Sequence, residues 1–254
     1  MEHLEGTQTI IAALNARQRR FEVVLVRHDS HADKVGELVA LAEQLNVPVR
    51  RVDGKELDAM AHGSSHGGVI AIATPKPRLT APQLYELVDE LREPALLLLL
   101  EGVDDERNLG FTLRTAEAMG VHAVLIKKHL WDFDAIEVSR PASGAYERLP
   151  LAQIDDVEPL KQLQRRGLRL YGCLATTKRT MYATDLSKGC ILAIGGEKRG
   201  LSGAVRSICD RFVSVPTRGG SASSLSLSHA SAILLAEAMR QRRPAGEVVE
   251  EEGG

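Results

Sequence analysis

Residues 191–234 constrain the fold of this 254-residue chain more than any other stretch. The stretch opens with a short apolar run, 191–194, that ends at Gly195 and Gly196. An apolar run bounded by glycine is typical of a buried strand, and glycine allows another group to approach the backbone closely. We therefore expect a buried strand whose end is a place for chemistry.

The residues after this strand predict a pocket. Ser202 can cap a helix, so we expect free N–H groups at the helix start beside the carboxylate of Glu197. A second apolar run, 212–215, stops at a proline, and a loop rich in glycine and serine, 217–224, leads into an apolar-periodic segment, 225–239, that predicts a helix. Two strand ends and a helix start then converge on a pocket lined by glycine and serine.

Composition limits the class of protein. With 44% hydrophobic and 26% charged residues, the chain can form one large core or two smaller ones. No window approaches about 18 uninterrupted apolar residues, and the N-terminus resembles neither a signal nor a transit peptide, so we expect a cytoplasmic protein without membrane contact. Three widely spaced cysteines, Cys173, Cys190 and Cys209, indicate reduced, buried thiols and no metal site.

Residues 1–76 predict a small α/β module. Helical and strand patterns alternate there, at 6–19, 21–26, 35–45, 47–52, 55–60 and 68–73. Three prolines then punctuate the chain, Pro75, Pro77 and Pro82. We therefore expect a linker and a connecting helix over 77–94.

Residues 95–243 predict a second, larger α/β domain. Ala95 and the five leucines after it are apolar on both faces, as a central parallel strand is. Further strand and helix patterns follow at 122–126, 157–166 and 168–175. We expect a doubly wound, mostly parallel sheet. The last residues, 244–254, contain four glutamates and predict a disordered acidic tail.

A helix that begins near Asn108 is expected to carry polar site residues. Gly110 and Arg114 are four residues apart, so they stand one above the other, and the missing side chain at Gly110 leaves room beside the guanidinium. Two plainer interpretations compete with a functional one. Arg114 could form a surface ion pair with Glu117, and Asn108 could simply cap the helix.

Four segments carry a resemblance to a known family: Asn-Leu-Gly at 108–110 with Arg114, Gly-Gly-Glu-Lys-Arg-Gly-Leu-Ser at 195–202, Val-Pro-Thr-Arg-Gly-Gly at 215–220 and Ser-Leu-Ser-Leu-Ser at 224–228. They resemble the three ordered motifs of the SpoU (TrmH) family of RNA ribose 2′-O-methyltransferases, in the SPOUT superfamily. The resemblance implies S-adenosylmethionine as cofactor, a Rossmann-like SPOUT domain with a C-terminal trefoil knot, and a homodimer through that domain. It also implies that residues 1–76 form a ribosomal-protein-like domain that binds the RNA substrate.

The resemblance also assigns roles to single residues. Arg114 would clamp the substrate phosphate and ease removal of the ribose proton electrostatically, because arginine is a poor base. Asn108 and Glu197 would hold the ribose or orient Arg114, and Ser226, where the family has asparagine, completes the catalytic set. The cofactor would lie on backbone groups of five residues: Gly195, Gly196, Val215, Ser224 and Leu225.

The implied reaction is methylation of RNA, with ribosomal RNA of the large subunit ahead of tRNA. Ser226 raises an alternative, an RNA-binding paralogue whose catalysis has lapsed, but the joint presence of Asn108, Arg114 and Glu197 favours the enzyme. A nucleotide-dependent oxidoreductase is disfavoured because no Gly-x-Gly-x-x-Gly follows the first strand. His229 is expected to be partly buried in the helix at the dimer interface rather than to act as a base.

Candidate RNA contacts lie in the first module. The net charge is −2, but the four tail glutamates contribute −4, so the rest of the chain is weakly basic. Arg17, Arg19 and Arg20 form a basic cluster there. His62 and His66 lie in a run of glycine and serine with no third ligand nearby, so a flexible loop that faces RNA is preferred over a metal site.

Overall fold

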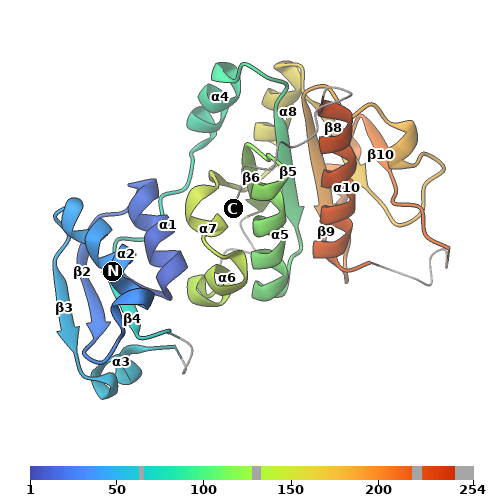
Figure 1. Cartoon of the computed structure of the whole chain (residues 1–254). Coiled ribbons are helices and arrows are strands. Elements are labelled where there is room, and N and C mark those ends of the chain that lie inside the picture. Colours follow the sequence, from blue (N-terminus) through green and yellow to red (C-terminus); the bar gives the residue numbers. More distant parts are fainter. Residues whose placement is uncertain (63–65, 128–132, 219–224, 244–254) are drawn as a thin grey trace.

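The computed structural model describes residues 1–62, 66–127, 133–218 and 225–243, which form two β-sheets side by side (Figure 1). The predicted acidic tail and Ser224 lie outside these ranges. The N-terminal sheet has four strands in the order β1-β4-β2-β3, and the C-terminal sheet has six in the order β10-β8-β9-β5-β6-β7. The predicted α/β class is confirmed for both parts.

The N-terminal sheet is mixed. Strand β4 pairs antiparallel with both β1 and β2, whereas β2 and β3 are parallel. Its elements are β1 (Glu2–Glu5), α1 (Thr7–Ala16), β2 (Phe21–Arg27), α2 (Ala32–Gln44), β3 (Val49–Val52), α3 (Gly54–Met60) and β4 (Val69–Ala73). The six predicted elements are all present. Sequence periodicity missed β1, because its Glu-His-Leu-Glu sequence contains a single apolar residue.

Both faces of this sheet are covered. Side chains alternate along a strand, so Val24 and Val26 join one core with helices α1 and α2, while Leu25 faces the other way. Leu25 packs with Ile70 and with Leu57 of α3. The module therefore has hydrophobic cores of its own.

The C-terminal sheet is parallel throughout. Its strands are β5 (Leu96–Glu101), β6 (Ala123–Lys127), β7 (Leu151–Ile154), β8 (Arg169–Cys173), β9 (Cys190–Gly195) and β10 (Arg211–Val213). The described helices are α4 (Ala81–Glu90), α5 (Glu106–Ala118), α6 (Ala135–Ala142), α7 (Ala145–Arg148), α8 (Glu158–Arg165), the short 3-10 helix η2 (Met181–Ala183), α9 (Gly203–Ile208) and α10 (Leu227–Arg242). Periodicity missed β7, α6 and α7. Within the described ranges, no helix is both long and apolar enough to cross a bilayer.

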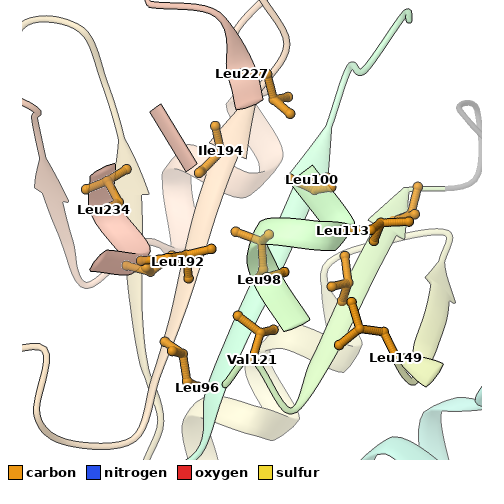
Figure 2. Packing of buried hydrophobic residues seen from close by; sticks show 14 of the residues in the cluster. Leu96, Leu98, Leu100, Leu113, Val121, Leu149, Leu192, Ile194, Leu227 and Leu234 are labelled. Atoms are coloured by element: carbon orange, nitrogen blue, oxygen red, sulfur yellow. The ribbon is translucent and has the colours of Figure 1, made fainter. Parts of the chain in front are cut away.

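The leucine run forms a strand buried on both faces, as predicted. Leu96, Leu98 and Leu100 pack with side chains of α5 and α10, whereas Leu97 and Leu99 pack on the opposite side with α4 and α8. Figure 2 shows the first layer, with the side chains of Leu192, Ile194 and Leu234 among its members. Strand β5 therefore lies in the middle of a sheet covered on both sides.

Gly110 serves helix packing. A Cβ atom at this position would lie 2.4 Å from the Cγ atom of Pro141 and 2.4 Å from the carbonyl oxygen of Val138, both in α6. The prediction that Gly110 leaves room beside Arg114 is wrong, because the space is taken by the backbone of α6. The sequence could not reveal this contact while α6 itself was missed.

Arg19 joins the two parts of the molecule. Its side chain is 2% exposed, and Nε and Nη2 donate to the two carboxylate oxygens of Glu147 in α7, each at 2.8 Å. Nη1 donates to Oε2 of Glu2 at 2.7 Å and to the carbonyl oxygen of Thr74 at 2.9 Å. Arg19 is thus not available to RNA, contrary to expectation, although Arg17 remains exposed.

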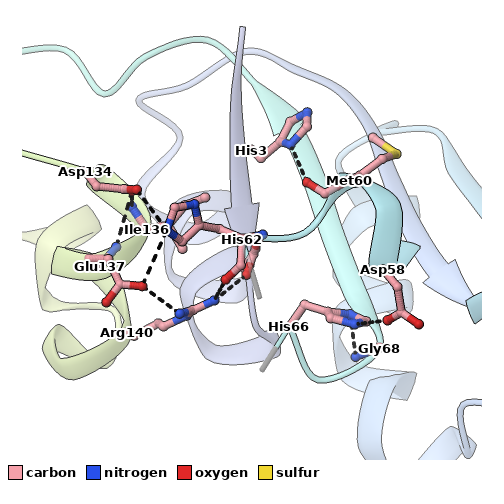
Figure 3. Close-up of polar contacts among 11 residues, drawn as sticks. His3, Asp58, Met60, His62, His66, Gly68, Asp134, Ile136, Glu137 and Arg140 are labelled. Atoms are coloured by element: carbon pink, nitrogen blue, oxygen red, sulfur yellow. Dashed lines mark hydrogen bonds and ion pairs between the residues drawn. The ribbon is translucent and has the colours of Figure 1, made fainter. Parts of the chain in front are cut away.

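The two histidines are also held by protein contacts (Figure 3). His66 is buried, and its Nε2 lies 2.9 Å from Oδ1 of Asp58. His62 lies against α6, with Nε2 at 3.4 Å from Oδ2 of Asp134. The expectation of an RNA-facing pair is wrong for His66; residues 63–65 lie outside the described ranges.

Arg140 of α6 forms a second bridge between the parts. Its Nη2 donates to Oε2 of Glu5 at 2.8 Å, and its Nη1 donates to Oε1 of Glu137 at 2.7 Å (Figure 3). The Glu5 side chain is buried. Strand β1 therefore contributes a buried carboxylate to the contact between the N-terminal part and helix α6.

Glu147→Ala is expected to lower the free energy of unfolding by about 3 to 5 kcal/mol, because it leaves the buried Arg19 guanidinium without its bidentate partner. Asp89→Ala is the control, since Asp89 pairs with Arg166 at 3.3 Å on the surface and its loss should cost about 0 to 1 kcal/mol. Urea unfolding of both variants measures the difference. A similar, small change in both would contradict the role of the Arg19–Glu147 pair.

Candidate active site

The site forms where β5 and β9 end side by side. The two strands pair in register, with Glu101 opposite Gly195, and the amide of Gly196 donates to the carbonyl oxygen of Glu101 at 2.5 Å. Helix α5 starts after β5, and the loop of residues 196–202 starts after β9. The parallel pairing therefore brings segments that are far apart in sequence to the same edge of the sheet.

Glycine is required in this loop by the protein's own backbone. A Cβ at Gly196 would lie 1.7 Å from the carbonyl oxygen of Gly102, and one at Gly195 would lie 2.1 Å from the carbonyl carbon of Gly200. Close approach to these glycines was expected, and it is present. The approaching groups are the turn after β5 and the far side of the same loop.

Ser202 caps α9, as predicted, with its side chain accepting from the amide of Val205 at 3.4 Å. The nearby carboxylate is a different one from that expected. The amide of Ser202 donates to Oε2 of Glu101 at 2.8 Å. The placement of Glu197 at this helix start is therefore wrong, and Glu101, the last residue of β5, takes that position.

Glu197 instead joins the starts of two other helices. Its Oε1 lies 3.5 Å from Nδ2 of Asn108 in α5 and 3.3 Å from the amide nitrogen of Leu227 in α10. Ser228 completes the cluster, donating its hydroxyl to Oδ1 of Asn108 at 3.2 Å. All three sequence motifs thus contribute to one hydrogen-bonded group.

Asn108 is free for this role because another residue caps α5. Asp105 is the N-cap, and its Oδ1 accepts from the amide of Asn108 at 2.7 Å. The plainer interpretation of Asn108 as the cap is therefore wrong. Its side chain amide points instead to Glu197 and Ser228.

Ser226 lies next to the cluster and caps α10. Its Oγ accepts from the amide of His229 at 3.4 Å and lies 2.6 Å from Nδ1 of that histidine and 3.1 Å from Oγ of Ser228. His229 is exposed in the single chain, and its burial at a dimer interface stays a prediction. Among the described residues, Ser226 is linked to Asn108 through Ser228, and to Glu197 through the start of the helix.

Arg114 stands apart from the cluster. It lies six residues after Asn108 on the same helix, which is about 9 Å along the axis, and its side chain is exposed. It has no hydrogen bond or ion pair with any residue in the described ranges. The expected alternative, an ion pair with Glu117, is wrong because Glu117 binds Arg148, with Nη2 and Oε2 at 2.8 Å.

A cavity of about 220 Å³ opens beside this group. Four of the five residues expected to hold the cofactor line it, together with Glu197; these are Gly195, Gly196, Val215 and Leu225. Apolar residues form most of the remaining wall: Cys173, Leu174, Ile194, Val213, Leu227 and Leu234. Burial raises the pKa of the Cys173 thiol, so it is a neutral part of that wall.

The lining fits the cofactor that the sequence resemblance implies. Apolar walls suit an adenine ring and a thioether chain, and strand-end backbone groups can fix their orientation. The carboxylate of Glu197 at the edge suits a positively charged sulfonium or a ribose hydroxyl. Across the described residues, no cluster of three His, Cys, Asp or Glu side chains is arranged to hold a metal ion.

Sequence reasoning missed several members of the site. Leu227 acts through its backbone amide, which leaves no trace in sequence pattern. Ser228 was part of a recognised motif without a role of its own. Glu101 and Lys127, which bind each other, are the last residues of the neighbouring strands β5 and β6. The one sequence signal that could have marked them is a charged residue directly after an apolar run.

Comparison with known proteins gives concordant matches over the whole chain. Residues 95–236 match the SpoU rRNA Methylase family, and residues 3–79 match the family described as RNA 2'-O ribose methyltransferase substrate binding. The 23S rRNA (guanosine-2'-O-)-methyltransferase RlmB of Pseudomonas syringae pv. tomato is 35% identical over 243 residues, covering 95% of this chain and 96% of that protein.

Solved structures agree on the fold. The crystal structure of the SpoU methyltransferase AviRb from Streptomyces viridochromogenes is 26% identical with a TM-score of 0.79, covering 94% of this chain and 89% of that one. AviRb has also been solved in complex with the cofactor AdoMet, and that structure superposes with a TM-score of 0.80 at 23% identity.

Gly196→Ala is expected to lower the free energy of unfolding by about 1 to 3 kcal/mol, because the new methyl group would collide with the carbonyl oxygen of Gly102. Gly203→Ala is the matched control, since a Cβ there has no atom within 4 Å and alanine favours the helix. Chemical denaturation compares the two. If Gly196→Ala were as stable as Gly203→Ala, the close contact between the two turns would be disproved.

Proposed function

Because the chain belongs to the SpoU rRNA methylase family, we propose that it transfers a methyl group from S-adenosylmethionine to the 2′-hydroxyl of a guanosine ribose in 23S ribosomal RNA. The observation that carries this proposal is the joining of Asn108, Glu197 and the start of α10 at the edge of the cavity. An oxidoreductase has no support from this site.

The reaction is an in-line displacement, for which bound S-adenosylmethionine supplies an electrophilic methyl group. The protein must hold the ribose hydroxyl in line with that group and favour loss of its proton. Asn108 and Glu197 hold the ribose, since their side chains lie next to each other at the start of α10. Gly195, Gly196, Val215, Leu225 and Ser224 hold the cofactor.

Arg114 acts on the substrate phosphate. Its exposed guanidinium has no partner within the described ranges, so it can donate two hydrogen bonds to phosphate oxygens. A positive charge beside the phosphate and the developing alkoxide favours loss of the proton without arginine itself acting as a base.

An active enzyme is favoured over an RNA-binding paralogue that has lost catalysis. The replacement of the family asparagine by Ser226 was the reason for that alternative. Ser226 keeps a structural role as the cap of α10, and the bond between Asn108 and Glu197 forms without it. The curated relative at 35% identity carries a methyltransferase name.

We further propose a division of labour in which residues 1–76 bind RNA, 77–94 connect, and 95–243 perform the chemistry. Arg17 and Arg20 are exposed and can contact phosphates, whereas Arg19 cannot. Phosphate contacts position a substrate without touching the methyl donor. Replacing Arg17 and Arg20 by alanine should flatten the salt dependence of RNA binding; an unchanged slope would reject this division.

Assembly, knot and location are narrower proposals from the family. The chain forms a homodimer through its C-terminal domain, and light scattering at micromolar concentration tests this. It carries a C-terminal trefoil knot, for which a crystal structure is the test. The hydrogen bond between Glu197 and Leu227, which joins the loop 196–202 to the start of α10, is consistent with this knot. A ribosomal RNA substrate places the enzyme in the cytoplasm, which cell fractionation tests.

The direct test of function is to incubate the purified chain with isotope-labelled S-adenosylmethionine and unmodified 23S rRNA. We expect label in RNA, and mass spectrometry of the nucleosides should place the methyl group on a guanosine ribose. Label on a base, or in tRNA alone, would overturn the proposed substrate. Cofactor binding without any transfer would favour the lapsed paralogue.

Arg114→Ala should reduce the single-turnover rate of methyl transfer roughly a hundredfold, the cost of losing one transition-state contact of about 3 kcal/mol. S-adenosylmethionine affinity should be unchanged, because Arg114 is not part of the cavity wall. Arg165→Ala, on the exposed face of α8, is the control and should transfer at the wild-type rate. A fast Arg114→Ala enzyme would remove Arg114 from the mechanism.

A further inference from the structure

One residue, Glu101, holds both ends of the loop that carries Glu197, one end through its backbone carbonyl and the other through its buried carboxylate. Glu101 is the last residue of β5, and its side chain is 4% exposed. Its carbonyl oxygen accepts from the amide of Gly196, and its Oε2 accepts from the amide of Ser202 at 2.8 Å. Residues 196–202 are therefore fixed at their first and last positions by a single residue.

Lys127 completes this arrangement from the next strand. It ends β6, its side chain is 13% exposed, and its Nζ donates to Oε1 of Glu101 and, at 3.2 Å, to Oγ of Ser202. Burial opposes ionisation of Glu101, but the hydrogen bonds from Lys127 and Ser202 outweigh it and hold the pKa of the carboxyl below its usual value. The Glu101 carboxyl is thus ionised at neutral pH.

The position of Glu197 depends on this loop more than on its own contacts. Its side chain is exposed, and the two hydrogen bonds that it makes are long, at 3.5 and 3.3 Å. Contacts of that length do not fix a side chain by themselves. The backbone of residues 196–202 must therefore place the carboxylate, and its anchors are Glu101 and the close packing of Gly196 on Gly102.

Stability alone does not account for a buried ion pair here. Replacing such a pair by apolar residues is often neutral or stabilising. Apolar residues could fill the space between β5 and β6, but they could not accept the hydrogen bond that the amide of Ser202 donates. What Glu101 and Lys127 provide is a fixed geometry for the loop beyond them.

We propose that the side chains of Glu101 and Lys127 are positioning groups for methyl transfer, which act through Glu197 by clamping the loop 196–202 at its Ser202 end. This inference rests on the proposed methyltransferase function. Neither side chain needs to touch RNA or the methyl group.

The test compares Glu101→Gln with Glu197→Gln in single-turnover methyl transfer to 23S rRNA. Ser202 and Lys127 donate to different oxygens of Glu101, and in Glu101→Gln one of these oxygens becomes an NH2 group that cannot accept. The variant should therefore lower the rate about a hundredfold, as a displacement near 1 Å can. The KM for RNA should stay within about twofold, since the clamp does not contact substrate. In the Glu197→Gln background, adding Glu101→Gln should change the rate by less than about threefold.

A paired substitution provides the rescue. In Glu101→Gln combined with Lys127→Gln, one amide can accept from Ser202 and donate to the other amide, so at least about tenfold of the lost rate should return. Asp89→Asn is the control, because it changes a carboxyl to an amide in a surface pair, and it should transfer at the wild-type rate.

Each outcome decides between the alternatives. Losses that multiply in the Glu101→Gln, Glu197→Gln double variant would mean that Glu101 does not act through Glu197, and a wild-type rate in Glu101→Gln would overturn the clamp. If Glu101→Gln fails to fold, Lys127→Gln in the two backgrounds gives the same comparison. A wild-type chain that transfers no methyl group to any RNA would instead refute the proposed function.

Discussion

The parallel pairing of β5 with β9 is the constraint on which the rest of this molecule depends. It places Glu101 opposite Gly195, so that the turn after one strand and the loop after the other lie in contact. The contact is so close that a side chain at position 196 would collide with the carbonyl oxygen of Gly102. Asn108 and Glu197 lie in the segments that follow these two strands, and there they meet the start of α10.

Two ion pairs with buried carboxylates join the N-terminal and C-terminal parts. Arg19 and Glu147 form a buried bidentate pair, and Arg140 reaches the buried Glu5 from the other side. The N-terminal module is therefore held to α6 and α7, and α6 in turn packs on α5 at Gly110. A continuous set of packed elements runs from the module to the helix that carries Asn108, which suits an enzyme that must present one nucleotide to one methyl group.

Much of this could be predicted from sequence, and the reasons for the failures are physical. Apolar runs predicted the positions of the buried strands, and the motif residues indicated which strand ends would meet. Strand β1, with one apolar residue, has no pattern to detect. The roles of Arg19, His66 and Glu101 depend on burial by segments far away in the chain, and charge in a sequence carries no record of burial. Gly110 was expected to leave room beside Arg114, whereas helix α6 packs against it.

The central claim of this account is that Asn108 and Glu197 act as one unit in methyl transfer to a ribose. A double-mutant cycle tests it most directly, with single-turnover rates for Asn108→Ala, Glu197→Ala and the combined variant on 23S rRNA. We predict that the combined loss is close to that of the more damaging single change, because the two side chains lie next to each other and would hold the same ribose. Losses that multiply would contradict the account, since they would show two residues that contribute independently.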